Sequence, residues 1–229
     1  MIEICNMTKM YHGSKRKVLD NLNLSIEDGQ IVSLIGRNGA GKSTLIRIVA
    51  GIISADSGCI KKRNEDSIGV MLGGDMQLYQ SLTGYEIISF FGKLRDLEQN
   101  EIDKRIEELD IILHLKKFYK MPAYTYSRGM RQKIGLMISI IHDPNIILMD
   151  EPSTGLDLEA SNDVIEFIKF LRDRNRTILI ATHNIFEISD LSDLIAPLND
   201  GKIQKLVDTQ KLFEKCDTDE KIKKILQLL

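Results

Sequence analysis

The stretch GRNGAGKST, Gly36–Thr44, matches the pattern G-x-x-x-x-G-K-[ST] of loops that bind nucleotide phosphates. It follows IVSLI, residues 31–35, a short run apolar enough to form a strand buried on both faces. The residues after it, STLIRIVAG, have helical spacing, and Gly51 is placed as a helix stop signal. Strand, glycine-rich loop and helix therefore occur in the order that a phosphate-binding loop requires, and we predict that the chain binds a nucleotide.

Each residue type in this loop has a chemical reason. Glycines let the backbone curl so that its N–H groups surround the β-phosphate, and the helix that starts near Lys42 adds the positive end of its dipole. Lys42 is expected to reach the β- and γ-phosphates, and the Ser43 hydroxyl is expected to bind Mg²⁺. The predicted nucleotide-binding residues of the loop are Gly36, Arg37, Asn38, Gly39, Ala40, Gly41, Lys42, Ser43 and Thr44.

The rest of the chain predicts an α/β fold. Alternating or short apolar runs predict further strands, at residues 2–7, 22–26, 59–61, 68–72, 146–149, 177–181, 193–196 and 202–207. The segment NEIDKRIEELDIIL spaces Ile102, Ile106, Leu109 and Leu113 as an amphipathic helix does. We expect one domain with a P-loop NTPase (RecA-like) fold, made of a mainly parallel sheet core, residues 1–83 and 143–229, with an N-terminal antiparallel β part, and an inserted α-helical subdomain, residues 84–142.

A pair of acidic residues follows another apolar strand. IILMDEP places Asp150 and Glu151 at the carboxyl end of that strand, where ligands collect in open α/β sheets. Asp150 is expected to hold Mg²⁺, usually through water, and Glu151 to act on the attacking water as a general base or orienting group. The alternative is that Asp-Glu-Pro merely ends a strand, and the phosphate loop upstream argues against it.

These two motifs, with YSRGM between them and STGLD and ATHN after them, resemble the ATP-binding subunits of ABC transporters. The resemblance runs from Tyr11 to about residue 201 and implies ATP and Mg²⁺ as cofactors. It implies that Tyr11 stacks on adenine, although an exposed turn tyrosine is the alternative. It also implies that Asp157, in the loop 153–157, communicates between two ATP sites, and that His183 is catalytic, contacting the γ-phosphate and steadying the attacking water.

YSRGM resembles the family signature LSGGQ, with Ser127 and Gly129 at its serine and last glycine and departures at Tyr126, Arg128 and Met130. In the family this segment, here Ser127, Arg128 and Gly129, binds the ATP of a second chain. Two chains packed head to tail, as a homodimer or with a similar subunit, would then sandwich each ATP. The alternative is that Ser127 simply caps the helix that follows, and both roles are compatible.

Composition limits the partners. The 31 basic and 33 acidic residues leave a net charge of −2, which argues against nucleic acid as a partner. Three widely spaced cysteines, with no C-x-x-C pair, suggest neither a disulfide framework nor a zinc site and favour a reducing cytosol. No apolar run reaches the ~20 residues of a membrane helix. The resemblance therefore implies a cytoplasmic protein, peripheral on the cytoplasmic face of the cell membrane, that serves separate multi-span membrane subunits.

The resemblance also locates the expected contact with those subunits near residues 73–95. Gly74 stands where most family members carry a glutamine that links Mg²⁺, water and the membrane partner, and Asp75 or Gln77 is a candidate substitute. The short chain and the LTGYE context resemble exporters with six-helix membrane subunits. Two alternatives are an ABC ATPase that acts outside transport, in cell division or translation, and a nucleotide-dependent interaction module with negligible turnover. Glu151 and His183 argue against the second.

Overall fold

The computed structural model describes residues 1–14, 16–63, 65–73 and 78–229. Its main sheet has the strand order β10-β8-β3-β7-β6-β5, with β9 paired to β8, and the strands from β8 to β5 are parallel. The strands of this sheet are β3 (Ile31–Ile35), β5 (Ile68–Met71), β6 (Ile146–Asp150), β7 (Thr177–Ala181), β8 (Leu194–Asn199), β9 (Lys202–Ile203) and β10 (Val207–Asp208).

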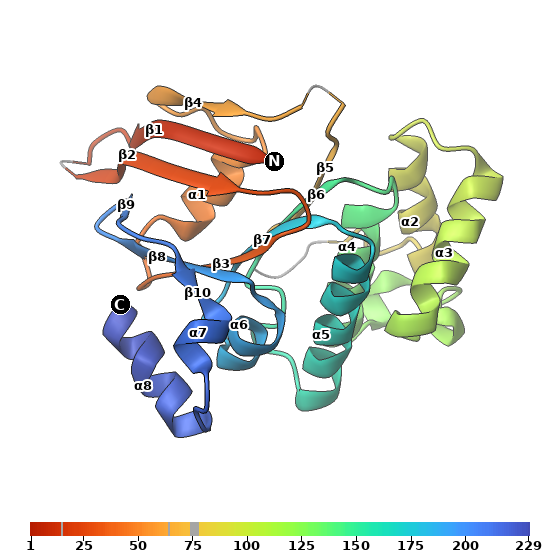
Figure 1. The fold of residues 1–229 in the computed structure, drawn as a ribbon. Helices are drawn as coiled ribbons and strands as arrows, with labels where there is room; N and C mark the ends of the chain where they lie inside the picture. The colour runs from red at the N-terminus through yellow and green to blue at the C-terminus, as the bar shows by residue number, and fades with distance from the viewer. Residues whose placement is uncertain (15, 64, 74–77) are drawn as a thin grey trace.

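A smaller antiparallel sheet has the order β2-β1-β4 and lies above the main sheet in Figure 1. Its strands are β1 (Ile2–Met10), β2 (Lys17–Ile26) and β4 (Ser57–Lys61). The helices are α1 (Lys42–Val49), α2 (Gly84–Lys93), α3 (Gln99–Leu113), α4 (Arg128–Ile140), α5 (Leu158–Asp173), α6 (Ile185–Leu191), α7 (Thr209–Phe213) and α8 (Thr218–Leu228), with short 3₁₀ turns η1 (Lys116–Phe118) and η2 (Ala123–Thr125).

The main sheet is buried because apolar side chains cover both of its faces. Every residue of β3, β6 and β7 is buried, as their uninterrupted apolar sequences predicted. One face packs with α1 and the antiparallel sheet, and the other packs with α4 and α5. Figure 1 shows α1 between the two sheets and α5 on the opposite side of the main sheet. The predicted α/β class, with a mainly parallel core and an antiparallel N-terminal part, is confirmed.

The helical segment also follows its pattern. Between β5 and β6 the chain forms α2, α3 and α4, and the spaced residues Ile102, Ile106, Leu109 and Leu113 of α3 are all buried. Thr83 caps α2 in a capping box with Glu86, which fixes where that helix begins. Among the described residues, no helix is both long enough and apolar enough to cross a membrane.

Several strand predictions were wrong in extent, and the largest miss is the second strand, which was predicted at residues 22–26 but begins at Lys17 as β2. The first strand was predicted to end at residue 7, but β1 continues to Met10, because Lys9 and Met10 pair with Leu19 and Lys17 of β2. The predicted strand 202–207 is divided into β9 and β10, which pair with different parts of β8. A short β-hairpin and a separate edge pairing replace one continuous strand.

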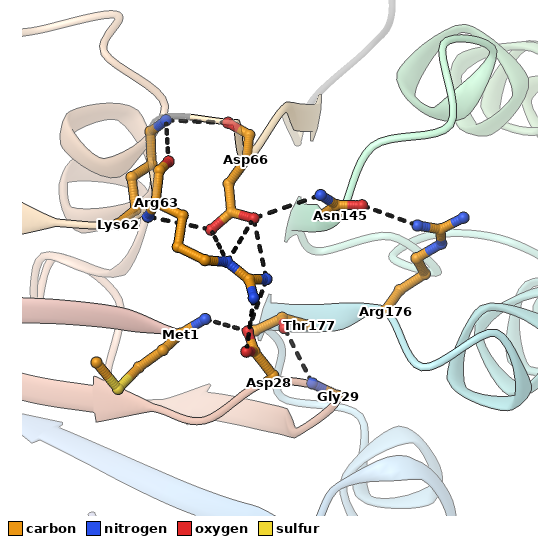
Figure 2. Close-up of polar contacts among 9 residues, drawn as sticks. All are labelled: Met1, Asp28, Gly29, Lys62, Arg63, Asp66, Asn145, Arg176 and Thr177. Atoms are coloured by element: carbon orange, nitrogen blue, oxygen red, sulfur yellow. Dashed lines mark hydrogen bonds and ion pairs between the residues drawn. The ribbon is translucent and has the colours of Figure 1, made fainter.

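A polar network ties the connection after β4 to the main sheet (Figure 2). Asp66, whose side chain is fully buried, accepts hydrogen bonds from Arg63 at 3.2 Å and from Asn145 at 3.3 Å. Arg63 also lies 3.3 Å from Asp28, and Arg176 donates to Asn145 at 3.0 Å. Because Asn145 precedes β6, this network fixes the end of the antiparallel sheet against the strand that carries Asp150 at its other end.

Asp66→Asn is expected to lower the free energy of unfolding by about 1–3 kcal/mol at pH 7, because a buried charged acceptor is lost. Burial opposes ionisation of Asp66, yet the hydrogen bonds from Arg63 and Asn145 hold its pKa below the ordinary value. An acid whose pKa is lowered in the folded protein contributes stability that is fully present above its unfolded pKa of about 3.9. This stability is lost as the pH falls through the folded pKa. The difference between variant and parent in urea unfolding should therefore shrink below about pH 4. Asp173→Asn, on an exposed side chain, is the control.

Candidate active site

The loop between β3 and α1 requires glycine for steric reasons. Gly39 and Gly41 have φ angles of +80° and +109°, in the left-handed region that side chains disfavour. A Cβ atom at Gly36 would lie 2.6 Å from the Leu198 carbonyl oxygen, and one at Gly41 would lie 2.8 Å from the Val18 carbonyl oxygen. The loop therefore curls between β2 and the end of β8, with its backbone N–H groups at the start of α1.

Lys42 closes this loop. It is the first residue of α1, its exposed fraction is 8%, and its Nζ donates to the Gly36 carbonyl oxygen at 2.7 Å. A phosphate oxygen placed in the loop can take over this hydrogen bond from the carbonyl group, since an ammonium group binds an anion more strongly. The backbone geometry and the cation together make an anion site.

A pocket of about 480 Å³ opens over the loop. Its walls are Tyr11, Val18, loop residues between Arg37 and Thr44, and the acidic pair Asp150 and Glu151. The Tyr11 hydroxyl lies 3.2 Å from the Thr44 hydroxyl, and 42% of Tyr11 is exposed. The structure thus brings Tyr11, the phosphate loop and the acidic pair to one pocket, and the tyrosine ring remains accessible to a base.

Asp150 ends β6 with an exposed fraction of 4%, and its Oδ1 atom has no hydrogen-bond partner within the described residues. Burial raises the pKa of this carboxyl group and the Glu151 charge adds to the rise, whereas a hydrogen bond from the Ser43 side chain acts in the opposite direction. No cluster of three or more His, Cys, Asp or Glu side chains suited to a metal occurs in the described part of the chain. A cation here would be held by Asp150, the Ser43 hydroxyl and oxygen atoms of the nucleotide or water, the set that Mg²⁺ accepts.

Glu151 has a strained backbone. Its φ angle of 52° lies in the left-handed region, which is uncommon for a residue with a side chain, and a hydrogen bond of 2.8 Å from its N–H to the Ala181 carbonyl group holds it there. Its Oε2 accepts from the Thr154 hydroxyl at 2.8 Å and lies 2.8 Å from His183 Nδ1. The two residues predicted to act on the attacking water therefore contact each other directly.

The predicted signature segment is elsewhere. Ser127 caps α4 by accepting from the Met130 N–H at 3.2 Å, so the predicted helix cap is confirmed. A Cβ atom at Gly129 would lie 3.1 Å from the Ala160 Cβ atom, and one at Gly155 would collide with the Arg128 guanidinium group. The start of α4 thus packs beside residues 155–160, and none of Ser127, Arg128 and Gly129 lines the pocket over the phosphate loop.

Asp157 caps the neighbouring helix. Its carboxylate accepts from the Ala160 N–H at 2.8 Å at the start of α5. The residues predicted at Gly74, Asp75 and Gln77 lie outside the described residues.

Two buried polar side chains beside the site had not been predicted. Gln132 on α4 donates from Nε2 to the Pro152 carbonyl oxygen at 2.6 Å, which ties the helix after the signature segment to the residue that follows Glu151. Glu187 on α6 is fully buried, and burial raises its pKa, with repulsion by Glu151 adding and the Ser153 and Thr182 hydroxyls acting in the opposite direction. Glu187 could have been predicted near the site, because it lies four residues after His183 in the sequence. Gln132 could not, because its sequence context is that of an ordinary helix residue.

Glu187→Gln is expected to stabilise the protein more as the pH rises. A buried acid with a raised pKa contributes stability below its unfolded pKa of about 4.3 and loses it as the pH rises through the folded value. The variant lacks this loss, so its advantage in the free energy of guanidinium unfolding should grow as the pH rises above the unfolded pKa of about 4.3, by about 1–3 kcal/mol in total, the usual desolvation penalty. Glu159→Gln, on an exposed residue, should show no such trend. If the free energies of unfolding of Glu187→Gln and the parent change with pH in parallel, Glu187 does not have a raised pKa in the folded protein.

The fold and this pocket define a nucleotide-binding protein of the phosphate-loop class. The ABC transporter family model matches residues 19–154. The chain is 34% identical over 226 residues to the ABC transporter ATP-binding protein NatA of Bacillus subtilis (strain 168), with 93% of this chain and 92% of that protein covered. It is 31% identical over 234 residues to the lantibiotic transport ATP-binding protein SrtF of Streptococcus pyogenes, with 94% and 99% covered.

A solved structure agrees with these relatives. A dimeric ATP-binding cassette in a post-hydrolysis state, bound to ADP and Pi, matches with a TM-score of 0.80 and 25% identity, over 91% of this chain and 99% of that chain. The chain belongs to the ABC transporter family, in which it is an ATP-binding and ATP-hydrolysing subunit. The predicted family, P-loop NTPase fold and ATPase activity are confirmed.

Proposed function

We propose that two copies of this chain, or this chain and a similar subunit, close around ATP and that this closure powers a membrane exporter. The observation that carries the proposal is the separation of Ser127–Gly129 from the pocket over Gly36–Thr44. A serine hydroxyl and a glycine N–H at a helix start suit a phosphate ligand, yet they pack beside residues 155–160 instead. A second chain, packed head to tail, supplies them to the ATP, and the dimeric cassette matched above supports this arrangement.

Within each composite site the residues have distinct roles. Tyr11 stacks on adenine, the loop 36–44 binds the phosphates, and Ser43 and Asp150 hold Mg²⁺, as the unpartnered Oδ1 of Asp150 suggests. When bound, the ion neutralises charge that develops on the phosphate oxygens. Glu151 orients and deprotonates the attacking water.

The contact between His183 and Glu151 supports a shared task for these two side chains. His183 holds the Glu151 carboxylate before the nucleotide arrives and reaches the γ-phosphate once it is bound. Loss of that phosphate then removes the ligand that joins the two chains, and the dimer opens. A site with a positioned base argues against an interaction module with negligible turnover.

The membrane contact is proposed near residues 73–95, beside the helical subdomain 84–142. Large apolar side chains are exposed there: Tyr79 at 56%, Phe90 at 42% and Leu94 at 60%, and Tyr79 packs edge-on against Phe90 with ring centroids 5.9 Å apart. Exposed apolar groups of this kind mark contact sites for other proteins. We propose that multi-span membrane subunits dock here and hold the chain on the cytoplasmic face of the membrane. SrtF, named for lantibiotic transport, favours an exporter of peptide-like compounds over a role outside transport.

Co-purification with a candidate six-span membrane protein tests this docking. We expect Phe90→Asp and Leu94→Asp to abolish capture of the membrane protein while the isolated chain hydrolyses ATP at the parent rate. Leu226→Asp, at a comparably exposed residue of α8, should leave capture intact. Full capture by both the Phe90→Asp and Leu94→Asp variants would contradict the proposed surface. Co-sedimentation of the chain with ribosomes instead would favour the role in translation.

A further inference from the structure

The antiparallel sheet brings together two cysteines that are far apart in the sequence. Cys5 of β1 and Cys59 of β4 are direct cross-strand partners, and both are free thiols. Residues opposite each other in an antiparallel pair have Cα atoms about 4.5–5.5 Å apart. Disulfides join residues whose Cα atoms are about 4.4–6.8 Å apart, so the pairing itself meets the first requirement for a bond.

The two side chains also share one face of the sheet. Side chains alternate along a strand, so Cys5 lies on the same face as Glu3, and Cys59 on the same face as Lys61. Glu3 and Lys61 are the partners two positions along, and they form an ion pair across the strands at 3.1 Å. Ile4, between Glu3 and Cys5, is buried on the opposite face. The cysteine side chains therefore lie together on the outward face of the sheet, the same face as the Glu3–Lys61 ion pair.

The backbones next to the pair are held close. Gly58 has a φ angle of +95°, and a Cβ atom there would lie 2.6 Å from the carbonyl oxygens of both Cys5 and Asn6. Asn6 has a φ angle of 52°, and the strand register shifts between Cys5 and Thr8, which marks a bulge. The two strands are therefore held at close range next to the cysteine pair.

We propose that Cys5 and Cys59 are a redox-active pair that forms a cross-strand disulfide by exchange with a low-molecular-weight disulfide such as oxidised glutathione. The exposed Cys59 thiolate attacks one sulfur of the glutathione disulfide, forms a mixed disulfide and releases one glutathione thiolate. The Cys5 sulfur then attacks the Cys59 sulfur, and the second glutathione leaves. Two protein thiols are oxidised, one glutathione disulfide is reduced to two thiols, and the two protons pass to the departing glutathiones.

The surroundings assign the order of these steps. Burial raises the pKa of the Cys5 thiol, and its hydrogen bond to the Glu3 carboxylate adds to the rise, whereas the Lys61 charge acts in the opposite direction. A thiol with a raised pKa is a poor first nucleophile, and Cys59 is the more exposed of the two. Cys59 therefore reacts first with the small disulfide, and Cys5 resolves the intermediate.

The bond would enclose the phosphate loop. The segment between Cys5 and Cys59 contains β2, β3, the loop 36–41 and α1, so the cross-link restricts the unfolded chain over all of them. We expect the melting temperature of the oxidised chain to exceed that of the reduced chain by about 5–10 °C, the usual effect of closing a loop of this kind.

The test incubates the purified full chain with reduced and oxidised glutathione at a series of ratios, then blocks free thiols and measures intact and peptide masses. The parent and a Cys216→Ser control should lose two hydrogens, yield a peptide joining Cys5 to Cys59, melt at a higher temperature, and revert with dithiothreitol. Cys5→Ser and Cys59→Ser should form no such link and show no rise in melting temperature. Glutathione retained on Cys59 while Cys5 stays free, or links through Cys216 or to a second chain, would overturn the proposal.

Discussion

Glu151→Gln is expected to slow ATP hydrolysis by about 10²-fold or more, because a positioned general base contributes rate enhancements of that order. Glutamine has nearly the same shape but cannot accept a proton from water. It can still accept from the Thr154 hydroxyl through its amide oxygen, so the local structure around this strained residue is retained. ATP binding should therefore persist, and the chain should accumulate as an ATP-bound dimer that does not open.

The measurement is phosphate release under saturating ATP, together with molar mass by light scattering with and without ATP. Glu166→Gln, at an exposed residue of α5, is the control and should match the parent in both. Hydrolysis at the parent rate by Glu151→Gln would show that another group activates the water. If Glu151→Gln loses hydrolysis as expected but no ATP-bound dimer accumulates, Glu151 would be the base but its loss would not hold the dimer closed.

Lys42→Ala is expected to weaken ATP binding by about 10–100-fold, the usual cost of losing a hydrogen bond from a charged group. Lys42 is the buried cation in the loop, and its bond to Gly36 shows that its ammonium group already points into the space for phosphate. Alanine favours the helix that begins here, so α1 should persist. Fluorescent-nucleotide titration measures the change.

Lys169→Ala on α5 gives the matched control, since Lys169 pairs only with Glu166 at 2.8 Å among the contacts seen for it within the described residues. The control should bind ATP as the parent does. Equal affinity of Lys42→Ala and the parent would mean that the backbone N–H groups alone provide the phosphate site.

Local signals explain what could be predicted from the sequence. β3, the glycine loop and α1 are contiguous, and their chemistry depends on neighbours only a few residues away, so GRNGAGKST was sufficient. The same holds for Ser127, which caps the helix that directly follows it. The cap by Asp157 had not been predicted, although it too depends on the residues directly after it. The acidic pair Asp150 and Glu151 was recognisable because an apolar strand delivers it to the sheet edge.

Contacts that depend on strand order could not be predicted in this way. The pairing of Cys5 with Cys59 requires β4 to lie beside β1, and nothing local specifies that register. The bond from Gln132 to Pro152 depends on how α4 crosses the end of β6. The division of residues 202–207 into β9 and β10 arises because the edge of β8 that does not face β3 pairs at its start with β10 and at its end with β9.

Mixing two inactive variants tests most directly whether each active site is shared between two chains. Lys42→Ala damages the phosphate loop, and Ser127→Asp keeps the helix cap but places a carboxylate against the γ-phosphate of the neighbouring chain. In a mixed dimer, the intact loop of the Ser127→Asp chain faces the intact segment of the Lys42→Ala chain. The account predicts that the mixture hydrolyses ATP faster than the sum of the two variants measured alone. If differential labelling verifies mixed dimers but the mixture hydrolyses ATP only at the summed rate of the two variants, the shared active site is contradicted.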